Sequence, residues 1–506
     1  MREDDTMIIG IDLGTTFSAA AYVAEDGKAK IIENRDGERT TPSVVMFESD
    51  GVCVGEQAKL NSIVDPYNVC QFVKRQMGNP SYKFETDDGE IYSPEDISAI
   101  ILKRIKDDCE EALGQKIDRA VITVPAYFND AQRKATQDAG RIAGLDVKAV
   151  INEPTAAAIA FGYQQGETQK KVMVFDLGGG TFDVTIIEFN KEKIDIVATC
   201  GHKNLGGFDF DNAIINYAVD EFEKETGADL YDDDVAMQDL RERAESVKKA
   251  LSRREKAQLS ISSEGKVVKV EITKAQFESM IERKLRDAQD IMEIAMDDAG
   301  LEWKDLDKIL LVGGSTRIPA IQDMITKVTG ITPSHEINPD EAVALGAAYY
   351  AETLNETNSE KKQEKEYVVS DVNSHSLGIL AVDADGKMEN SIVIKRNSKL
   401  PAEVSSSFST VFDDQEEIEL SVVEGEDTDP EFCTIIGHTT LKLNKHPSGS
   451  PINIVMQYDT NGVVHVRVTD LVDLIDLGEM EIKRTANLTE DNILGKESRM
   501  LGLNIN

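Results

Sequence analysis

Two segments of the sequence share one pattern that strongly limits the possible folds. Residues 8–16 read Ile-Ile-Gly-Ile-Asp-Leu-Gly-Thr-Thr, and residues 173–181 read Met-Val-Phe-Asp-Leu-Gly-Gly-Gly-Thr. Each is an apolar strand that ends in Asp-Leu-Gly and continues into small and hydroxyl-bearing residues. Glycine allows backbone N–H groups to approach a phosphate closely, and an aspartate at the strand end can hold hydrated Mg²⁺. The repeat therefore predicts two lobes that clamp a polyphosphate from opposite sides.

The alternative interpretation is that each segment is only a tight hairpin turn that requires glycine. A third glycine turn at 313–315, after the apolar strand 308–312, argues against it. The sequence has no G-x-x-x-x-G-K-[ST] run, which excludes a P-loop NTPase. Its histidines lack metal-ligand spacing, and residues 313–317 lack the closing glycine of a hydrolase nucleophile elbow. These absences leave phosphoryl chemistry without a covalent nucleophile.

At 506 residues the chain is too long for one compact core. Residues 355–366 contain no apolar side chain and predict a solvated connector. Before it, strands alternate with amphipathic helices, including a capped helix from Thr273 to Gly300; after it, apolar residues alternate with polar ones. We therefore expect an α/β domain at 1–354, a linker at 355–370, a β sandwich at 371–485 and a short remainder at 486–506.

The formal net charge of −38 limits the possible partners. Such an acidic surface repels nucleic-acid backbones and anionic membranes. No stretch reaches the roughly 18 apolar residues that a membrane helix needs, and the first residues lack the pattern of a signal peptide. The five cysteines are scattered and form no CxxC pair, which predicts reduced thiols. We expect a cytoplasmic protein without nucleic-acid or membrane partners.

Five long motifs resemble those of the DnaK-type chaperones, the seventy-kilodalton heat-shock family. They lie at residues 10–16, 120–128, 176–183, 311–319 and 337–343, in the order found in that family. The resemblance extends from about residue 8 to about residue 492. It implies an actin-like, two-lobed ATPase domain, a linker, and a β sandwich that binds extended hydrophobic peptides of unfolded proteins. It also implies a J-domain co-chaperone and a nucleotide exchange factor as partners.

The resemblance further assigns roles in a nucleotide site. Asp12 and Asp176 would position hydrated Mg²⁺, while Lys74, Glu153, Asp176, Asp183 and Thr181 would carry out hydrolysis. The implied cofactors are ATP or ADP and Mg²⁺, with K⁺ as a further candidate. Nucleotide contacts are implied for Gly14, Thr15, Thr16, Phe17, Gly178, Gly179, Gly180, Gly206, Gly207, Glu245, Lys248, Lys249, Ser252, Gly313, Gly314, Ser315, Arg317 and Asp340.

Some of these positions have simpler interpretations. Taken alone, Lys74 reads as a solvated surface charge. On spacing alone, Glu245, Lys248 and Ser252 fit an ordinary solvated helix face better than a nucleotide site. Phe208, next to Gly206 and Gly207, stands where family members often have an acidic residue.

For the sandwich, the resemblance implies a peptide groove and a signalling route. Pro125 and Arg133 match positions that relay the nucleotide state, although Arg133 alone reads as a surface arginine. Val382 and Val411 flank loops and could form an arch over the peptide. The groove residues, each of which could equally be sandwich core, are Ile379, Val382, Phe408, Val411, Ile418 and Leu420.

Two departures from the family pattern bear on coupling. Of the family's long helical lid, only residues 488–493 match the beginning, which predicts fast peptide release. The linker segment 367–374 is poorer in leucine than the family's, and Ser374 replaces a common proline. We therefore expect weaker docking of the linker.

The sequence favours an ATP-hydrolysing chaperone whose nucleotide state controls peptide binding. A small-molecule kinase on the same actin-like scaffold would share the paired loops but would leave the β unit unexplained. A nucleotide-gated co-chaperone or scaffold with little turnover is the non-enzymatic alternative. The presence of Lys74, Glu153, Asp176 and Thr181 argues against it.

Overall fold

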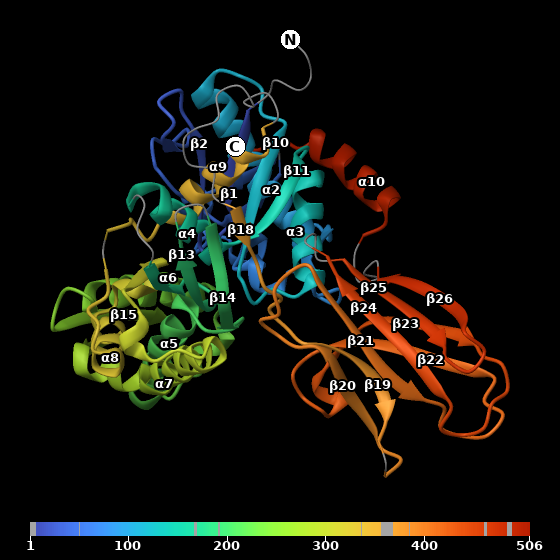
Figure 1. Cartoon of the computed structure of the whole chain (residues 1–506). Coiled ribbons are helices and arrows are strands. Elements are labelled where there is room, and N and C mark those ends of the chain that lie inside the picture. Colours follow the sequence, from blue (N-terminus) through green and yellow to red (C-terminus); the bar gives the residue numbers. More distant parts are fainter. Residues whose placement is uncertain are drawn as a thin grey trace.

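The computed structural model contains the predicted two-lobed α/β domain followed by an all-β sandwich. Figure 1 shows a blue-to-cyan lobe, a green-to-yellow lobe beside it, and an orange-to-red β unit that lies against both. The predicted connector lies outside the described residues, Asn355 excepted, and so do residues 460–462 of the turn between two predicted strands. The structure describes residues 7–49, 51–165, 170–190, 193–334, 336–355, 368–383, 385–459, 463–482 and 488–506.

Both lobes repeat one strand arrangement. β1 pairs antiparallel with β2 and parallel with β10, and β12 pairs antiparallel with β13 and parallel with β17. Each Asp-Leu-Gly segment is thus the turn of a hairpin, so the hairpin interpretation describes the local geometry correctly. In spatial order, the sheet of the first lobe contains β11 (Asp146–Asn152), β10 (Arg119–Val124), β1 (Ile8–Asp12), β2 (Phe17–Val23) and β3 (Ala29–Ile32), with β4 (Thr41–Pro42) beside β2. The sheet of the second lobe contains β17 (Lys308–Val312), β12 (Lys170–Leu177), β13 (Phe182–Phe189), β14 (Lys193–His202) and β18 (Val368–Ser370).

Helices α4 (Glu153–Gln165) and α9 (Ala342–Thr353) join the two sheets. Their apolar residues share one buried cluster with β1, β10, β12 and β17. The helices cross closely at Gly346, where an added Cβ would lie 1.7 Å from the carbonyl oxygen of Ala156. Gly10 of β1 approaches α9 in the same way, because an added Cβ would lie 2.2 Å from the backbone nitrogen of Ala348. Glycine at these positions allows the close packing that holds both hairpin turns at one cleft.

Other helices and small sheets cover the outer faces of the lobes. The predicted capping box of Thr273 and Gln276 begins α7, and Gly300 ends it with a φ of 65°, as the sequence indicated. These helices are α1 (Glu56–Asn61), α2 (Pro94–Leu113), α3 (Asp130–Ile142), α5 (Gly207–Thr226), α6 (Asp234–Leu251), α7 (Lys274–Ala299) and α8 (Pro319–Thr329). One small sheet contains β5 (Val44–Glu48), β6 (Gly51–Val54) and β7 (Val69–Gln71). A second contains β8 (Phe84–Glu85) and β9 (Ile91–Tyr92), and a third contains β15 (Lys256–Ser263) and β16 (Lys266–Thr273).

The C-terminal β unit consists of two four-stranded antiparallel sheets around one apolar core. The alternation of apolar and polar residues predicted after the connector is confirmed, since Ile452, Ile454 and Met456 of β24 point into that core. In spatial order the sheets are β20 (Met388–Ile394), β19 (Leu377–Val382), β22 (Glu417–Glu424) and β23 (Thr434–Lys442); and β21 (Ala402–Ser409), β24 (Pro451–Tyr458), β25 (Val464–Asp470) and β26 (Ile475–Ile482).

Two segments that belong neither to the core of the α/β domain nor to the β sandwich pack onto the lobes. β18, from the predicted linker, adds a parallel strand to the second lobe, with Val368 opposite Lys193 and Ser370 opposite Asp195. Helix α10 (Glu490–Leu501), red in Figure 1, lies against α2 and α3 of the first lobe. Its Ile493 and Met500 are buried in the core of that lobe. The matched beginning of a lid therefore rests on the first lobe rather than on the sandwich.

Within the described residues, no helix is both long and apolar enough to cross a bilayer. All five cysteines are free thiols, and four of them are buried.

Gly346→Ala tests the close crossing of α4 and α9. The added Cβ would collide with backbone, so we expect the change to cost about 1–3 kcal/mol of unfolding free energy in the α/β domain. The matched control is Gly495→Ala on α10, an exposed helical glycine with open space around its Cα. It should be neutral or stabilise by up to about 1 kcal/mol. Thermal unfolding of both variants measures the difference, and equal stability would contradict the packing role of Gly346.

Candidate nucleotide site

A cavity of about 1360 Å³ opens between the two lobes, and both hairpin turns line it. Most residues predicted to contact nucleotide line this cavity, although they come from distant parts of the chain. Gly180 and Gly206 lie directly behind the lining residues. The predicted residues in the lining are Asp12, Gly14, Thr15, Thr16, Phe17, Lys74, Glu153, Asp176, Gly178, Gly179, Thr181, Gly207, Glu245, Lys248, Lys249, Ser252, Gly313, Gly314, Ser315, Arg317 and Asp340.

The two hairpin turns interlock through glycine. A Cβ added to Gly179 would lie 2.5 Å from the side chain of Thr16, and one added to Gly180 would lie 2.7 Å from that of Thr15. Gly207 at the start of α5 donates a backbone hydrogen bond of 3.0 Å to Gly178. The turns and the N-terminus of α5 therefore place backbone N–H groups and hydroxyls around one point of the cleft. Such an arrangement suits phosphate oxygens.

Four carboxylates converge beside these turns: Asp12, Asp176, Asp183 and Glu153. Burial, and then the charge of Glu153, raise the pKa of Asp12 and of Asp183 to about 7. The same two causes raise the pKa of Asp176. Asp183 accepts hydrogen bonds from the backbone N–H groups of Ala126, at 3.2 Å, and the next residue, at 3.1 Å, which fix its side chain.

Lys74 is the cation among these carboxylates. Its side chain is buried and forms an ion pair with Glu153. The interpretation of Lys74 as a solvated surface charge is therefore wrong. The short 3₁₀ turn Val73–Gln76 presents the lysine to the cleft. One ammonium opposite three buried carboxylic groups and the half-buried Asp12 leaves the cluster short of positive charge whenever these groups ionise.

The residues present fit a hydrated divalent cation. The Oδ2 atom of Asp176 is buried and has no hydrogen-bond partner among the described atoms. A buried carboxylate oxygen without a partner is costly unless a cation or an ordered water satisfies it. Mg²⁺ prefers carboxylate oxygens and retains several waters, which matches Asp176 together with the neighbouring Asp12.

Helix α6 lines the other end of the cleft with charged residues. Glu245 contacts Lys59 of α1 at 2.5 Å and Lys249 at 2.8 Å, so one of its ion pairs crosses between the lobes. Burial raises the pKa of Glu245, but the two lysines more than offset it and lower the pKa to about 2. Lys248 is buried and contacts Asp211 at 2.8 Å. These residues form a structured wall, so the solvated-face interpretation of this helix is wrong.

The third glycine turn completes the cleft. The hydroxyl of Ser315 donates to the carbonyl of Gly178 at 2.8 Å, which ties this turn to the second hairpin. Arg317 and Asp340 form an ion pair of 2.5 Å at the rim. Gly313 has a φ of 82°, and an added Cβ would lie 2.4 Å from the carbonyl oxygen of Leu177, so only glycine fits there.

Sequence reasoning missed several residues of the cleft. Lys59 comes from a short helix without a recognisable motif, and no local signal could have placed it opposite Glu245. Asp211 belongs to the segment 205–211, four residues after Gly207. This spacing was only a weak indication that its side chain lines the cleft. The missed lining residues include Lys59, Gln71, Phe72, Asp211, Arg241, Glu242, Glu336 and Asn338.

Comparison with known proteins identifies the family. A family profile described as Hsp70 protein matches residues 8–499. The chaperone protein DnaK of Thermosipho melanesiensis is 43% identical over 480 residues, which cover 93% of this chain and 79% of that protein. Those of Thermotoga petrophila and Thermotoga maritima are 43% identical over 481 residues, with the same coverage. The chain belongs to the Hsp70 family.

Membership of the Hsp70 family confirms the predicted fold class and activity. The chain is an ATP-dependent chaperone and an ATPase, with an actin-like ATPase domain followed by a β sandwich. The family binds nucleotide. The kinase and low-turnover scaffold alternatives are not favoured.

Phe208 lies outside the lining of the nucleotide cleft in this Hsp70. Its ring contacts the ring of Phe72 edge to face, with centroids 4.8 Å apart. The guanidinium of Arg75 lies 4.4 Å from the Phe208 centroid, and that of Arg241 lies 5.6 Å from it. The aromatic residue therefore contacts side chains of both lobes.

The predicted peptide-groove residues of the Hsp70 sandwich fall into three groups. Ile379 and Leu420 are buried in the sandwich core, whereas Phe408 and Ile418 are partly buried. Val382 and Val411 are exposed by 39% and 55%. β19 pairs with β22 only from Leu377 to Ile379, so the two strands diverge towards Val382.

Arg133 and Pro125 lie at the contact between the ATPase domain and the sandwich. Pro125 is buried in the turn after β10. Arg133 donates to the carbonyl of Ala126 at 3.2 Å and to the side chain of Asn152 at 2.5 Å. Asn152 in turn donates to Asp371, the first residue of the predicted sandwich, at 2.9 Å. Arg133 is thus half-buried and belongs to a hydrogen-bond network with Ala126, Asn152 and Asp371, which we call the Arg133 network. Its interpretation as a surface arginine is wrong.

The raised pKa of Asp183 predicts a pH dependence of stability. The folded pKa of about 7 lies above the ordinary value near 4, so the contribution of this group is present at acid pH and is lost as the pH rises through 7. We expect the melting temperature of the nucleotide-free protein to fall between about pH 4 and pH 7, where the folded state binds more protons than the unfolded state, and to fall less in Asp183→Asn. The control is Asp220→Asn, an exposed change on α5. Equal pH dependence in Asp183→Asn and wild type would contradict the raised pKa.

Proposed function

We propose that nucleotide in the cleft controls peptide binding by the sandwich, and that the linker strand β18 and the Arg133 network carry the signal. The observation that supports this coupling is that β18 continues the sheet of the second lobe while the sandwich contacts both lobes. Tyr458 donates to Asp130 of the first lobe at 3.0 Å, and Arg396 contacts Asp298 of the second lobe at 3.0 Å. A change in the angle between the lobes would therefore alter both contacts.

Hydrolysis in the cleft depends on positioning and charge. We assign Lys74 to the γ-phosphate and Glu153 and Asp183 to accepting hydrogen bonds from the attacking water. The backbone hydrogen bonds to Asp183 hold its carboxylate in one orientation. Thr181 and the backbone of Gly178–Gly180 would donate to phosphate oxygens. Mg²⁺ held through water by Asp12 and Asp176 would neutralise charge on the phosphates.

The nucleoside would lie against α6 and the third glycine turn. Glu245, Lys248 and Ser252 line one side, and Gly314, Ser315, Arg317 and Asp340 line the other. Because Lys59 of the first lobe is paired with Glu245 of the second, opening of the cleft to release nucleotide must break this ion pair. The pair would therefore favour the closed arrangement of the lobes.

In the sandwich, divergent strands provide the peptide site. We propose that extended hydrophobic segments of unfolded proteins bind between β19 and β22, with Val382 and Val411 forming an arch over the peptide. Both side chains are exposed, so both are accessible to a bound peptide. We also propose a J-domain co-chaperone and a nucleotide exchange factor as partners, and the predicted domain limits at 354, 370 and 485.

Two substitutions test the hydrolysis site. Lys74→Ala and Asp176→Asn should each reduce the rate of ATP hydrolysis by at least about 100-fold, because each removes a charge that acts on the reacting phosphate. Both should retain nucleotide binding, which the rest of the cleft provides. The matched control is Lys269→Ala, an exposed lysine of β16. Single-turnover hydrolysis and nucleotide titration measure the two properties, and near wild-type hydrolysis in either variant would remove that residue from the mechanism.

Val369→Asp tests the coupling through β18. Val369 packs against the apolar cluster between the lobes, so a carboxylate there should release the strand. In the wild type, we expect an aliphatic peptide to dissociate at least about fivefold faster with ATP than with ADP, and to increase steady-state phosphate release. Both effects should disappear in Val369→Asp and persist in Val267→Asp, an exposed control on β16. Equal dissociation rates with ATP and ADP in the wild type would contradict the proposed coupling.

A further inference from the structure

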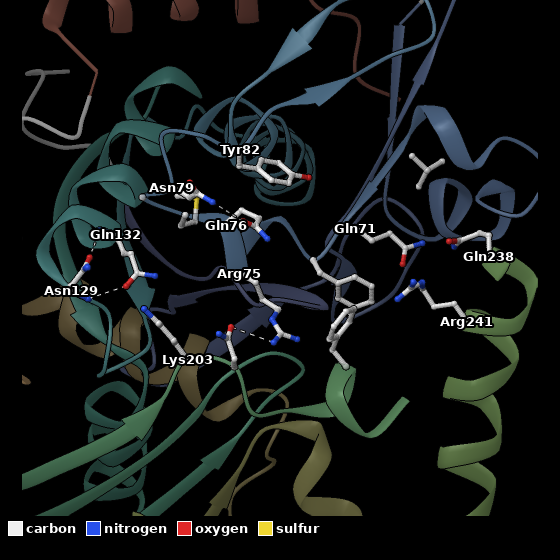
Figure 2. A pocket seen from close by; sticks show the side chains of 16 residues that line it. Gln71, Arg75, Gln76, Asn79, Tyr82, Asn129, Gln132, Lys203, Gln238 and Arg241 are labelled. Carbon is white, nitrogen blue, oxygen red and sulfur yellow. Dashed lines mark hydrogen bonds between the residues drawn. The ribbon is translucent and has the colours of Figure 1, made fainter. Parts of the chain in front are cut away.

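A second cavity of about 820 Å³ adjoins the nucleotide cleft and is shown in Figure 2. The two cavities share Gln71, Phe72 and Arg241 in their linings, so they lie on opposite sides of the same wall. The second cavity is formed by the end of β7 and the turn after it, the N-terminus of α3, the turn before α5, and one face of α6.

The lining of the second cavity contains three cations and no carboxylate, in a chain whose net charge is −38. Figure 2 shows Arg75 between Lys203 on one side and Arg241 on the other. Among the described residues, neither Lys203 nor Arg241 forms an ion pair, whereas Arg75 contacts Asp209 at 3.4 Å and Asn204 at 3.3 Å. Burial lowers the pKa of Arg241, and the charges of Asp211 and Glu242 offset part of this effect.

Amide side chains make up much of the remaining lining and supply further hydrogen-bond donors. Three of them already donate a hydrogen bond: Gln71 to Glu242 at 3.3 Å, Gln238 to Ser62 at 3.0 Å, and Asn79 to Gln76 at 3.1 Å. Cations together with amide donors form the usual surroundings of a phosphate-class anion in a protein. The amide residues are Gln71, Gln76, Asn79, Asn129, Gln132, Asn204 and Gln238.

Arg75 connects this cavity to the proposed hydrolysis site. It follows Lys74 in the chain, and its Cγ lies 3.1 Å from the position of a Cβ added to Gly180 in the second hairpin turn. Its guanidinium extends away from that turn and lies over the ring of Phe208. The edge-to-face pair of Phe72 and Phe208 closes the wall beside it. A phosphate released next to Lys74 therefore has one arginine side chain and two aromatic rings between it and the second cavity.

We propose that the second cavity is the exit site for the inorganic phosphate produced by ATP hydrolysis. The proposal rests on the nucleotide site proposed above. Arg75, Arg241 and Lys203 draw the phosphate dianion out of the acidic cluster, and movement of the Phe72–Phe208 pair opens the way. The charge gradient favours this direction, because Asp12, Glu153 and Asp176 line the nucleotide cleft at the hydrolysis site and the exit cavity lining contains no carboxylate.

The same chemistry could instead hold the phosphates of a second nucleotide from solution. A phosphate-exit site and a second nucleotide site differ in stoichiometry and in kinetics. Equilibrium dialysis with a non-hydrolysable ATP analogue should give one nucleotide per chain in the wild type and in Lys203→Glu. Two per chain in the wild type and one in Lys203→Glu would assign the cavity to nucleotide and overturn the exit proposal.

The kinetic test separates chemistry from product release in a single turnover. Chemical quench measures bond cleavage, and a fluorescent phosphate-binding reporter measures appearance of free phosphate. Lys203→Glu should leave the cleavage rate unchanged and slow phosphate release by about threefold or more at low salt, with a smaller effect at high salt. Lys203 is exposed and lies away from the cleft lining, and the matched control, Lys269→Glu, should match the wild type.

Phe208→Ala should change the rate of phosphate release in the opposite direction. Loss of the ring removes part of the wall, so phosphate release should be faster than in the wild type while cleavage is unchanged. Unchanged release in both Lys203→Glu and Phe208→Ala, with normal cleavage, would overturn the exit proposal alone. Absence of cleavage in the wild type would overturn the nucleotide site as well, so the two failures are distinguishable.

Discussion

The cluster of four carboxylic groups around Lys74 is the constraint on which the rest of the structure depends. Desolvation raises the pKa of Asp12 and Asp183 to about 7, so at neutral pH these two groups are poised between protonated and ionised forms. Bound cations would favour the ionised form. The lobes carry the carboxylates on separate sheets, and α4 and α9 hold those sheets together. Because the carboxylates come from both lobes, a bound cation that reduces their mutual repulsion also affects how the lobes are arranged.

The sandwich and the linker contact the same two sheets that carry the carboxylates. β18 lengthens the second sheet, and the first sheet reaches the sandwich through Asn152, at the end of β11, and Arg133 of α3. The residue after Asn152 is Glu153, the partner of Lys74. Adjacent residues therefore face the hydrolysis cluster and the domain contact, which gives the proposed coupling a short physical route. Helix α10 adds a further contact on the first lobe.

Local signals predicted the elements well where one short segment contains all the relevant chemistry. The capping box at Thr273 and the glycine at Gly300 specify the ends of α7, and the two-residue alternation specifies β24 and β25. Contacts between distant segments could not be predicted in this way. The pairing of Lys59 with Glu245, the position of Arg241 beside Phe208, and the packing of α10 on the first lobe depend on the arrangement of the lobes.

By itself, the sequence determined the two phosphate turns, because glycine, hydroxyl and aspartate residues at the end of an apolar strand act within a few residues of one another. It also determined the change from helical to alternating periodicity near residue 370. Only the tertiary structure decided that Lys74 is buried, that Arg133 belongs to a network, and that three cations share a cavity without carboxylates. Burial and electrostatic surroundings are set by segments far apart in the chain, and no local pattern records which of them meet.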